Sequence, residues 1–333
     1  MLAGRFVVGF STNLVIVIDH AFKPIWFKED LPLAIAIDIG FSRTGGALAI
    51  LLPQLIYDSL SIFHSPTFRL GASLLTAAGF MIIGLIFALI VFFMDFLREK
   101  TATKVSKPEP VSILNHFKQF PLKFWLIMAV NVTYLPLMYT VVGIAQVFFI
   151  QKYGLSTDMA NLANGLLFGS AVILIPIAGY LISKIGFHLY WLLTALVTTT
   201  LPPLLIFAFS NEESYLPFVA AVFYSLSYTL CGPSFIAMIP LIVEKRYLGT
   251  AYGIQRGSYS ATYSLMSYIA GLIVDTIGYF VLQSFFIHII LLCIDFTLIM
   301  VFLDAASDNP ILNVPASWLR RKYGQIKDKK SSQ

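Results

Sequence analysis

The chain has 333 residues, of which 58% are hydrophobic and 12% are charged, and its mean hydropathy is +0.82. A soluble domain carries about 25% charged residues, so this composition excludes a soluble fold and predicts an all-α protein in a lipid bilayer. The net charge of +5 does not indicate nucleic acid, because the basic residues cluster in loops beside apolar runs. Cys231 and Cys293 lie inside apolar runs, which predicts small buried hydrophobic residues and not metal ligands or a disulfide.

Nine segments are long and apolar enough for helical spans, each of which needs about 20 residues. They cover residues 3–22, 31–57, 70–97, 122–150, 160–183, 188–209, 215–243, 248–274 and 279–303. We expect a partial N-terminal half-bundle over residues 1–97, a cytosolic linker over 98–119, a six-helix C-terminal half-bundle over 120–304 and a basic tail over 305–333.

Lysine and arginine residues gather in alternate loops, in the long linker and in the tail, whereas the opposite loops carry only Arg69 and Lys152. This asymmetry places the linker and the C-terminus in the cytosol. Two-halves transporters divide six and six spans around one long cytosolic loop, but this chain divides three and six. We therefore expect the sequence to begin at the fourth helix of such a bundle. A genuine nine-span protein is the alternative.

Arg43 lies in an otherwise apolar span, where an ionisable residue costs about 2.5–3.5 kcal/mol on insertion scales. Gly45 and Gly46 follow it and allow close approach of a neighbouring backbone, so this face is expected to meet protein. There Arg43 could bind a carboxylate, or it could form a structural pair with a buried acid. Asp38 lies about 140° away around the helix and should face a different neighbour. Asp19 lies near a span end, where its charge can reach water.

The segment 248–274 is the most polar of the predicted spans. Its glycines recur every four residues, at Gly249, Gly253 and Gly257, which predicts a ridge for close helix packing. Arg256, Tyr259 and Tyr263 fall within about 60° of one another on the helix wheel. This stripe predicts the lining of a polar cavity, and ordinary packing is the alternative.

No phosphate-binding loop, zinc pattern, nucleophile elbow or paired-carboxylate spacing occurs in the sequence. The sequence therefore predicts a protein that is not an enzyme and uses no cofactor or metal. Transport would draw on a gradient of substrate or ion.

Several stretches resemble a known family. They are residues 4–9 (GRFVVG), 26–28 (WFK), 42–43 (SR), 121–127 (PLKFWLI), 147–156 (VFFIQKYGLS), 179–186 (GYLISKIG), 225–228 (SLSY), 247–253 (YLGTAYG) and 270–280 (AGLIVDTIGYF). In these stretches the chain resembles the major facilitator superfamily and, within it, the lysosomal dipeptide transporters. The resemblance covers nearly the full chain but begins at the family's fourth helix.

The resemblance implies a uniporter that exports dipeptides from the lysosome to the cytosol, as a multi-pass protein of the lysosomal membrane. The implied partners are dipeptides, a glycosylated single-span accessory membrane protein, a second copy in a homodimer and the lipid bilayer, with no nucleic acid. The alternative is a non-transporting membrane scaffold that binds an accessory protein.

The resemblance also implies the substrate site. In the family an arginine holds the substrate carboxylate and an acid holds the amino group; Arg43 falls on the arginine, and Asn13 falls on the acid. This chain therefore keeps the arginine for the substrate carboxylate but lacks the acid for the amino group. Arg256 adds a positive charge where the family has an amide. Asp19 is the alternative acid. The predicted substrate-binding residues are Arg43, Asn13, Arg256, Tyr259, Tyr263 and Ile236.

Overall fold

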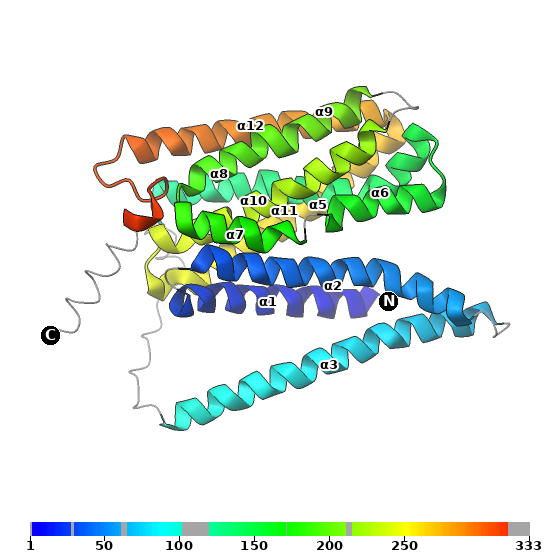
Figure 1. Cartoon of the computed structure of the whole chain (residues 1–333), viewed down its shortest axis with the longest axis horizontal. Coiled ribbons are helices and arrows are strands. Elements are labelled where there is room, and N and C mark those ends of the chain that lie inside the picture. The colour runs from blue at the N-terminus through cyan, green and yellow to red at the C-terminus, as the bar shows by residue number, and fades with distance from the viewer. Residues whose placement is uncertain are drawn as a thin grey trace. The chain divides into compact units, whose positions relative to one another are not determined.

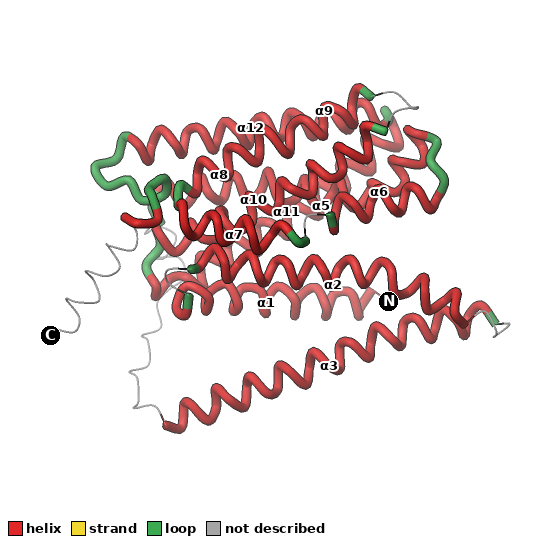
Figure 2. Tube along the Cα trace, viewed as in Figure 1, coloured by secondary structure: helices red, strands yellow, loops and turns green. Residues whose placement is uncertain are grey.

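The structure is a computed structural model that describes residues 2–27, 30–60, 65–101, 120–170, 172–210 and 215–318. Within these ranges the regular elements are helices, apart from an isolated β-bridge between Gly186 and Pro315 (Figure 2). This confirms the predicted all-α class. The chain forms two compact units, one of residues 1–43 with 113–333 and one of residues 44–112. The division falls inside a helix and not at the predicted linker, most of which, residues 102–119, lies outside the described residues.

The first unit is a bundle whose helices α5 to α12 pack against one another (Figure 1). It begins with α1 (Leu2–Trp26) and the first part of α2 (Leu31–Ser59). The remaining elements are α5 (Leu122–Tyr153), α6 (Thr157–Gly169), α7 (Leu174–Ile185), α8 (His188–Thr194), η2 (Ala195–Thr200), α9 (Leu201–Phe209), α10 (Leu216–Ile242), η3 (Lys245–Tyr247), α11 (Leu248–Thr276) and α12 (Tyr279–Ala305). Helices α5 and α10 bury side chains on all sides, as expected for central helices.

Prolines divide some predicted spans and not others. The segment 160–183 is not one helix, because α6 ends at Gly169 and α7 begins at Leu174. Pro176 in the first turn of α7 has no N–H group to continue the bonding of α6. In the segment 188–209 the residues directly before Pro202 and Pro203 adopt a π-helix. The different hydrogen-bond spacing of a π-helix lets the helix continue although the two prolines lack backbone N–H donors.

Six described helical segments are long and apolar enough to cross a membrane, whereas the sequence predicted nine spans. Three predicted spans are absent from this set. Two of them are α2, whose side chains are described without a break only over residues 31–46, and α11, which carries Arg256 among glycine, serine and tyrosine residues. The third is the divided pair α6 and α7, whose 13 and 12 residues are each too short for a hydrocarbon core of about 30 Å at 1.5 Å per residue.

The start of the predicted tail is part of the fold. The Phe187 amide donates to the Val314 carbonyl at 2.9 Å. Gly186 has a φ of +82°, and a Cβ there would lie 2.5 Å from the Ala316 nitrogen, so only glycine fits this junction. Residues 314–316 therefore pack against the turn between α7 and α8, and residues 319–333 lie outside the described part.

The second unit consists of the rest of α2 and α3 (Pro66–Thr101). Arg69 at the start of α3 lies over the Tyr57 ring at 4.0 Å and donates to the Tyr57 carbonyl at 2.7 and 2.9 Å. The apolar side chains along the rest of α3, from Phe80 to Leu97, are exposed, as suits a face toward lipid.

Close helix contact occurs at glycines other than those predicted. In the described residues, a Cβ built on any glycine of the α11 ridge would meet no atom within 4 Å; these are Gly249, Gly253 and Gly257. The predicted close packing of that ridge is therefore absent here. Instead, a Cβ on Gly179 of α7 would overlap Ala36 of α2, and one on Gly232 of α10 would lie 2.9 Å from Ile39. These two glycines let the first part of α2 approach the bundle.

Candidate functional site

Four tyrosines from three helices form one aromatic surface, which we call the tyrosine cluster: Tyr139 of α5, Tyr228 of α10, and Tyr259 and Tyr263 of α11. Tyr259 and Tyr263 are stacked, with ring centroids 5.9 Å apart and planes 8° apart. Tyr139 meets both edge-on, at 5.8 and 6.2 Å, and meets Tyr228 at 6.3 Å. These are favourable geometries for aromatic pairs, so Tyr139 joins α5, α10 and α11.

Arg43 lies against this cluster. Its side chain is 7% exposed, and its guanidinium carbon lies 4.2 Å from the Tyr228 centroid and 5.6 Å from that of Tyr139. The contact between Ile39 and Gly232 brings this part of α2 to α10. Arg43 therefore faces protein, as its sequence context predicted. A desolvated cation–π contact contributes about 2 kcal/mol and holds the planar group in one orientation.

Arg256 approaches the same cluster from α11. Its guanidinium carbon lies 4.7 Å from the Tyr259 centroid, and its Nε donates to Asn13 Oδ1 at 3.1 Å. Ser260 Oγ donates to the same oxygen at 3.4 Å, and Asn13 Nδ2 donates to the Gly9 carbonyl at 2.9 Å. The neutral amide of Asn13 thus connects α1 to α11.

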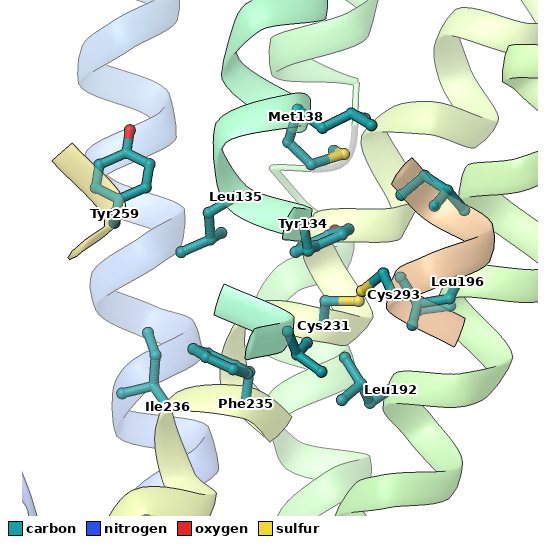
Figure 3. Close-up of a cluster of buried hydrophobic side chains, with 14 of the residues drawn as sticks. Tyr134, Leu135, Met138, Leu192, Leu196, Cys231, Phe235, Ile236, Tyr259 and Cys293 are labelled. Carbon is teal, nitrogen blue, oxygen red and sulfur yellow. The ribbon is translucent and has the colours of Figure 1, made fainter. Parts of the chain in front are cut away.

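Ile236 lies near the cluster but adds only apolar surface. It is buried in α10 and lines a small cavity with Tyr228, Gly232 and Phe235. Figure 3 shows Ile236 and Tyr259 at the edge of the buried core, apart from the cysteines at its centre. Cys231 and Cys293 are free and fully buried, which confirms their predicted character.

The acids of α1 and α2 belong to a separate group. Lys23 Nζ donates to Asp19 Oδ2 and, at 2.6 Å, to Asp38 Oδ2, so Asp38 does face a different neighbour from Arg43. Asp19, the alternative acid for the substrate, binds this lysine. His20 is buried beside them, with its ring 5.4 Å from that of Tyr252. Donor atoms of Asp19, His20 and Asp38 lie within 4.8 Å of one another, but the Lys23 ammonium already supplies the cation.

Two buried polar connections were not predicted. Asn131 of α5 and Gln255 of α11 exchange hydrogen bonds of 3.0 Å, from Asn131 Nδ2 to the Gln255 carbonyl and from Gln255 Nε2 to Asn131 Oδ1. The Tyr134 hydroxyl pairs with that of Ser227 at 2.8 Å, and Ser227 pairs with Thr200 in the π-helix. The sequence signal for both connections was the occurrence of amide and hydroxyl side chains inside apolar spans. Such side chains require hydrogen-bond partners when they are buried.

The site therefore joins two fixed positive charges, a broad aromatic surface and a neutral amide, within a helical membrane bundle. Such a set can bind an anionic or zwitterionic small molecule, because guanidinium groups match carboxylates and tyrosine rings supply contact area.

The fold is an all-helical bundle with segments that are long and apolar enough to cross a membrane, and residues 126–326 match the model of the Major Facilitator Superfamily. The chain belongs to this superfamily. It is similar to proteins named lysosomal dipeptide transporter MFSD1: it is 30% identical to that of Danio rerio over 292 residues, 30% to that of Bos taurus over 307, and 29% to that of Homo sapiens over 304. The matches cover 86%, 91% and 90% of this chain but 62%, 64% and 64% of those relatives, which is less than two thirds of their length.

Proposed function

We propose that this chain acts as a uniporter-type transporter that passes dipeptides, or similar small zwitterions and anions, across a membrane by alternating access. The observation that carries this proposal is Arg43, a buried cation held against Tyr228 and Tyr139 on a surface that Arg256 also reaches. Arg43 would bind the substrate carboxylate. Arg256, Tyr259, Tyr263 and Asn13 would line the remainder, with Ile236 beside them. Superfamily membership and the relatives' names support the reaction class.

The test is uptake of a radiolabelled dipeptide by proteoliposomes that contain the native protein or its Arg43→Ala and Arg43→Lys variants. Loss of a charge-assisted carboxylate contact of 1.5–3 kcal/mol predicts a fall in uptake of about 10- to 100-fold for Arg43→Ala. Arg43→Lys keeps the charge but loses the planar fork, so its uptake should be intermediate. Arg246→Ala is the control, because Arg246 is exposed and pairs with Glu244. Normal uptake by Arg43→Ala would contradict the proposal.

The resemblance also supports a proposal for the membrane location and the protein partners of this chain. We infer a multi-pass protein of the lysosomal membrane with its C-terminus in the cytosol, which the loop charges support. It would associate with a glycosylated single-span accessory membrane protein and form homodimers. An epitope at the C-terminus should then be accessible in intact lysosomes. Crosslinking before solubilisation should capture both partners.

A non-transporting scaffold is the second candidate. Asn13 favours it, because this neutral residue stands where the resemblance implies an acid for the substrate amino group, and its amide oxygen is engaged by Arg256. A scaffold would co-purify with the accessory protein, and dipeptides would not raise its melting temperature. A dipeptide-dependent rise in melting temperature that is lost in Arg43→Ala would exclude the scaffold.

A further inference from the structure

The substrate site carries two guanidinium groups on one aromatic surface. Arg43 contacts Tyr139 at 5.6 Å, Tyr139 contacts Tyr259 at 5.8 Å, and Arg256 contacts Tyr259 at 4.7 Å. Two cation–ring contacts and one ring–ring contact therefore connect the two cations, so a single bound molecule can meet both guanidinium groups on this surface.

The nearby acids do not neutralise Arg256. None of the ion pairs among the described residues involves Arg256, and its Nε meets the neutral amide oxygen of Asn13. The acids of the adjacent helices, Asp19 and Asp38, both bind Lys23. A cation at membrane depth is costly without a counter-charge, and like charges close together raise that cost. A second carboxylate on the ligand would offset the charge of Arg256.

We propose that this site selects substrates with two carboxylates, such as dipeptides with an acidic side chain, and that Arg256 determines this selectivity. This inference rests on the proposed transport function. Arg43 binds the carboxylate common to all dipeptides, and Arg256 binds the second carboxylate. Asn13 leaves that charge available to the substrate because an amide accepts the Arg256 hydrogen bond without cancelling the charge. The stacked rings of Tyr259 and Tyr263 contact the substrate beside the two arginines.

The test compares two peptides that differ only in this charge, Ala-Glu and Ala-Gln, as competitors of labelled dipeptide uptake by proteoliposomes that contain the native protein. Ala-Glu should compete about tenfold better than Ala-Gln, as expected for a charge-assisted contact. Arg256→Gln should reduce competition by Ala-Glu to the level of Ala-Gln. Arg246→Gln, at an exposed arginine, should retain the preference.

A second variant, which keeps Arg256, tests the inference even if Arg256→Gln misfolds. Asn13→Asp places a carboxylate 3.1 Å from Arg256 Nε and neutralises it within the protein. The preference for Ala-Glu should then disappear although Arg256 is present. Asn13→Ser, which adds no charge, should keep the preference.

The outcomes separate the inference from the proposed function. Equal competition by Ala-Glu and Ala-Gln in the native protein overturns the inference and leaves dipeptide transport intact. If no dipeptide is taken up, transport is contradicted, and thermal shift decides the inference. Stabilisation by Ala-Glu over Ala-Gln that is lost in Arg256→Gln then supports it, and the same melting temperature with either peptide overturns it.

Discussion

Lys123 and Asp304 join the first turn of α5 to the last turn of α12, with 2.6 Å between Nζ and Oδ1. The Asp304 side chain is fully buried and also accepts from the backbone amides of Ile311, Leu312 and Asn313 at 3.0 to 3.3 Å. One carboxylate therefore orders the turn that returns residues 306–318 to the bundle.

Asp304→Ala should destabilise the protein by about 3–5 kcal/mol, because it removes the acceptor of three backbone amides and the counter-charge of the Lys123 ammonium, which would keep only its hydrogen bond to Ser307 Oγ. The measurement is the melting temperature in detergent. Asp308→Ala at an exposed position of the same turn is the control and should change little. Equal melting temperatures for the two variants would show that the turn holds without this carboxylate.

Lys23→Met should separate α1 from α2, because two carboxylates would then face each other without a cation. The Asp19 and Asp38 side chains are 40% and 46% exposed, so solvent reduces the effect to about 1 kcal/mol. Lys184→Met is a matched control, since Lys184 is exposed and lies 5.5 Å from the Tyr180 ring. Urea titration of both variants at low salt measures the difference in unfolding free energy, and 1 M salt should narrow that difference.

Substitutions should destabilise the protein at the glycines that contact α2 but not at the glycines of the α11 ridge. Gly179→Val should lower stability by 1–3 kcal/mol or more, because its side chain would displace Ala36 and α2. Gly253→Ala should be neutral or raise stability by up to about 1 kcal/mol, because its Cβ meets open space in a helix. Melting temperatures of purified variants measure both. Loss of stability in Gly253→Ala would indicate a helix contact beyond the described residues.

Tyr139→Leu should weaken substrate binding, because Tyr139 alone contacts Arg43 and the three other rings of the cluster. A lost cation–π contact and aromatic pairs of about 0.5–1.5 kcal/mol each predict a KM about tenfold higher. Tyr139→Phe keeps the ring and should behave as the native protein. If Tyr139→Leu transports as well as Tyr139→Phe and the native protein, the ring lies outside the site.

The membrane class and the helix positions follow from the sequence because lipid imposes one strong rule, a long apolar segment for each span. The break at residues 170–173 did not follow, although Pro176 was visible. Pro136, Pro233 and Pro240 lie inside the continuous helices α5 and α10. Whether proline divides a helix depends on neighbours that replace the lost hydrogen bond, and those neighbours come from the tertiary structure.

The candidate site was predictable in part. Helical spacing placed Arg256, Tyr259 and Tyr263 together, since neighbours on one helix follow from geometry. The convergence of Arg43 and Tyr139 on the same rings could not follow from spacing, because it depends on how α2, α5 and α10 pack. The glycine ridge shows the same limit. A repeat marks a surface that can pack closely, and only the neighbouring helix decides whether it does.

Apart from the contact of Arg43 with Tyr228 and Tyr139, the contacts of α2 with α7 and α10 differ in kind from those between α5 and α11. Ala36, Gly40 and Ile39 meet Gly179, Pro176 and Gly232 through small apolar surfaces, and the Leu33 amide donates to Ser183 Oγ at 3.2 Å. Helices α5 and α11 are instead fixed by paired amides in their interior. Smooth surfaces of small side chains can slide with little loss of contact, whereas paired amides must break to move. Shear in this protein should therefore concentrate along α2, and helices α5 to α12 should move past it as a stiff body.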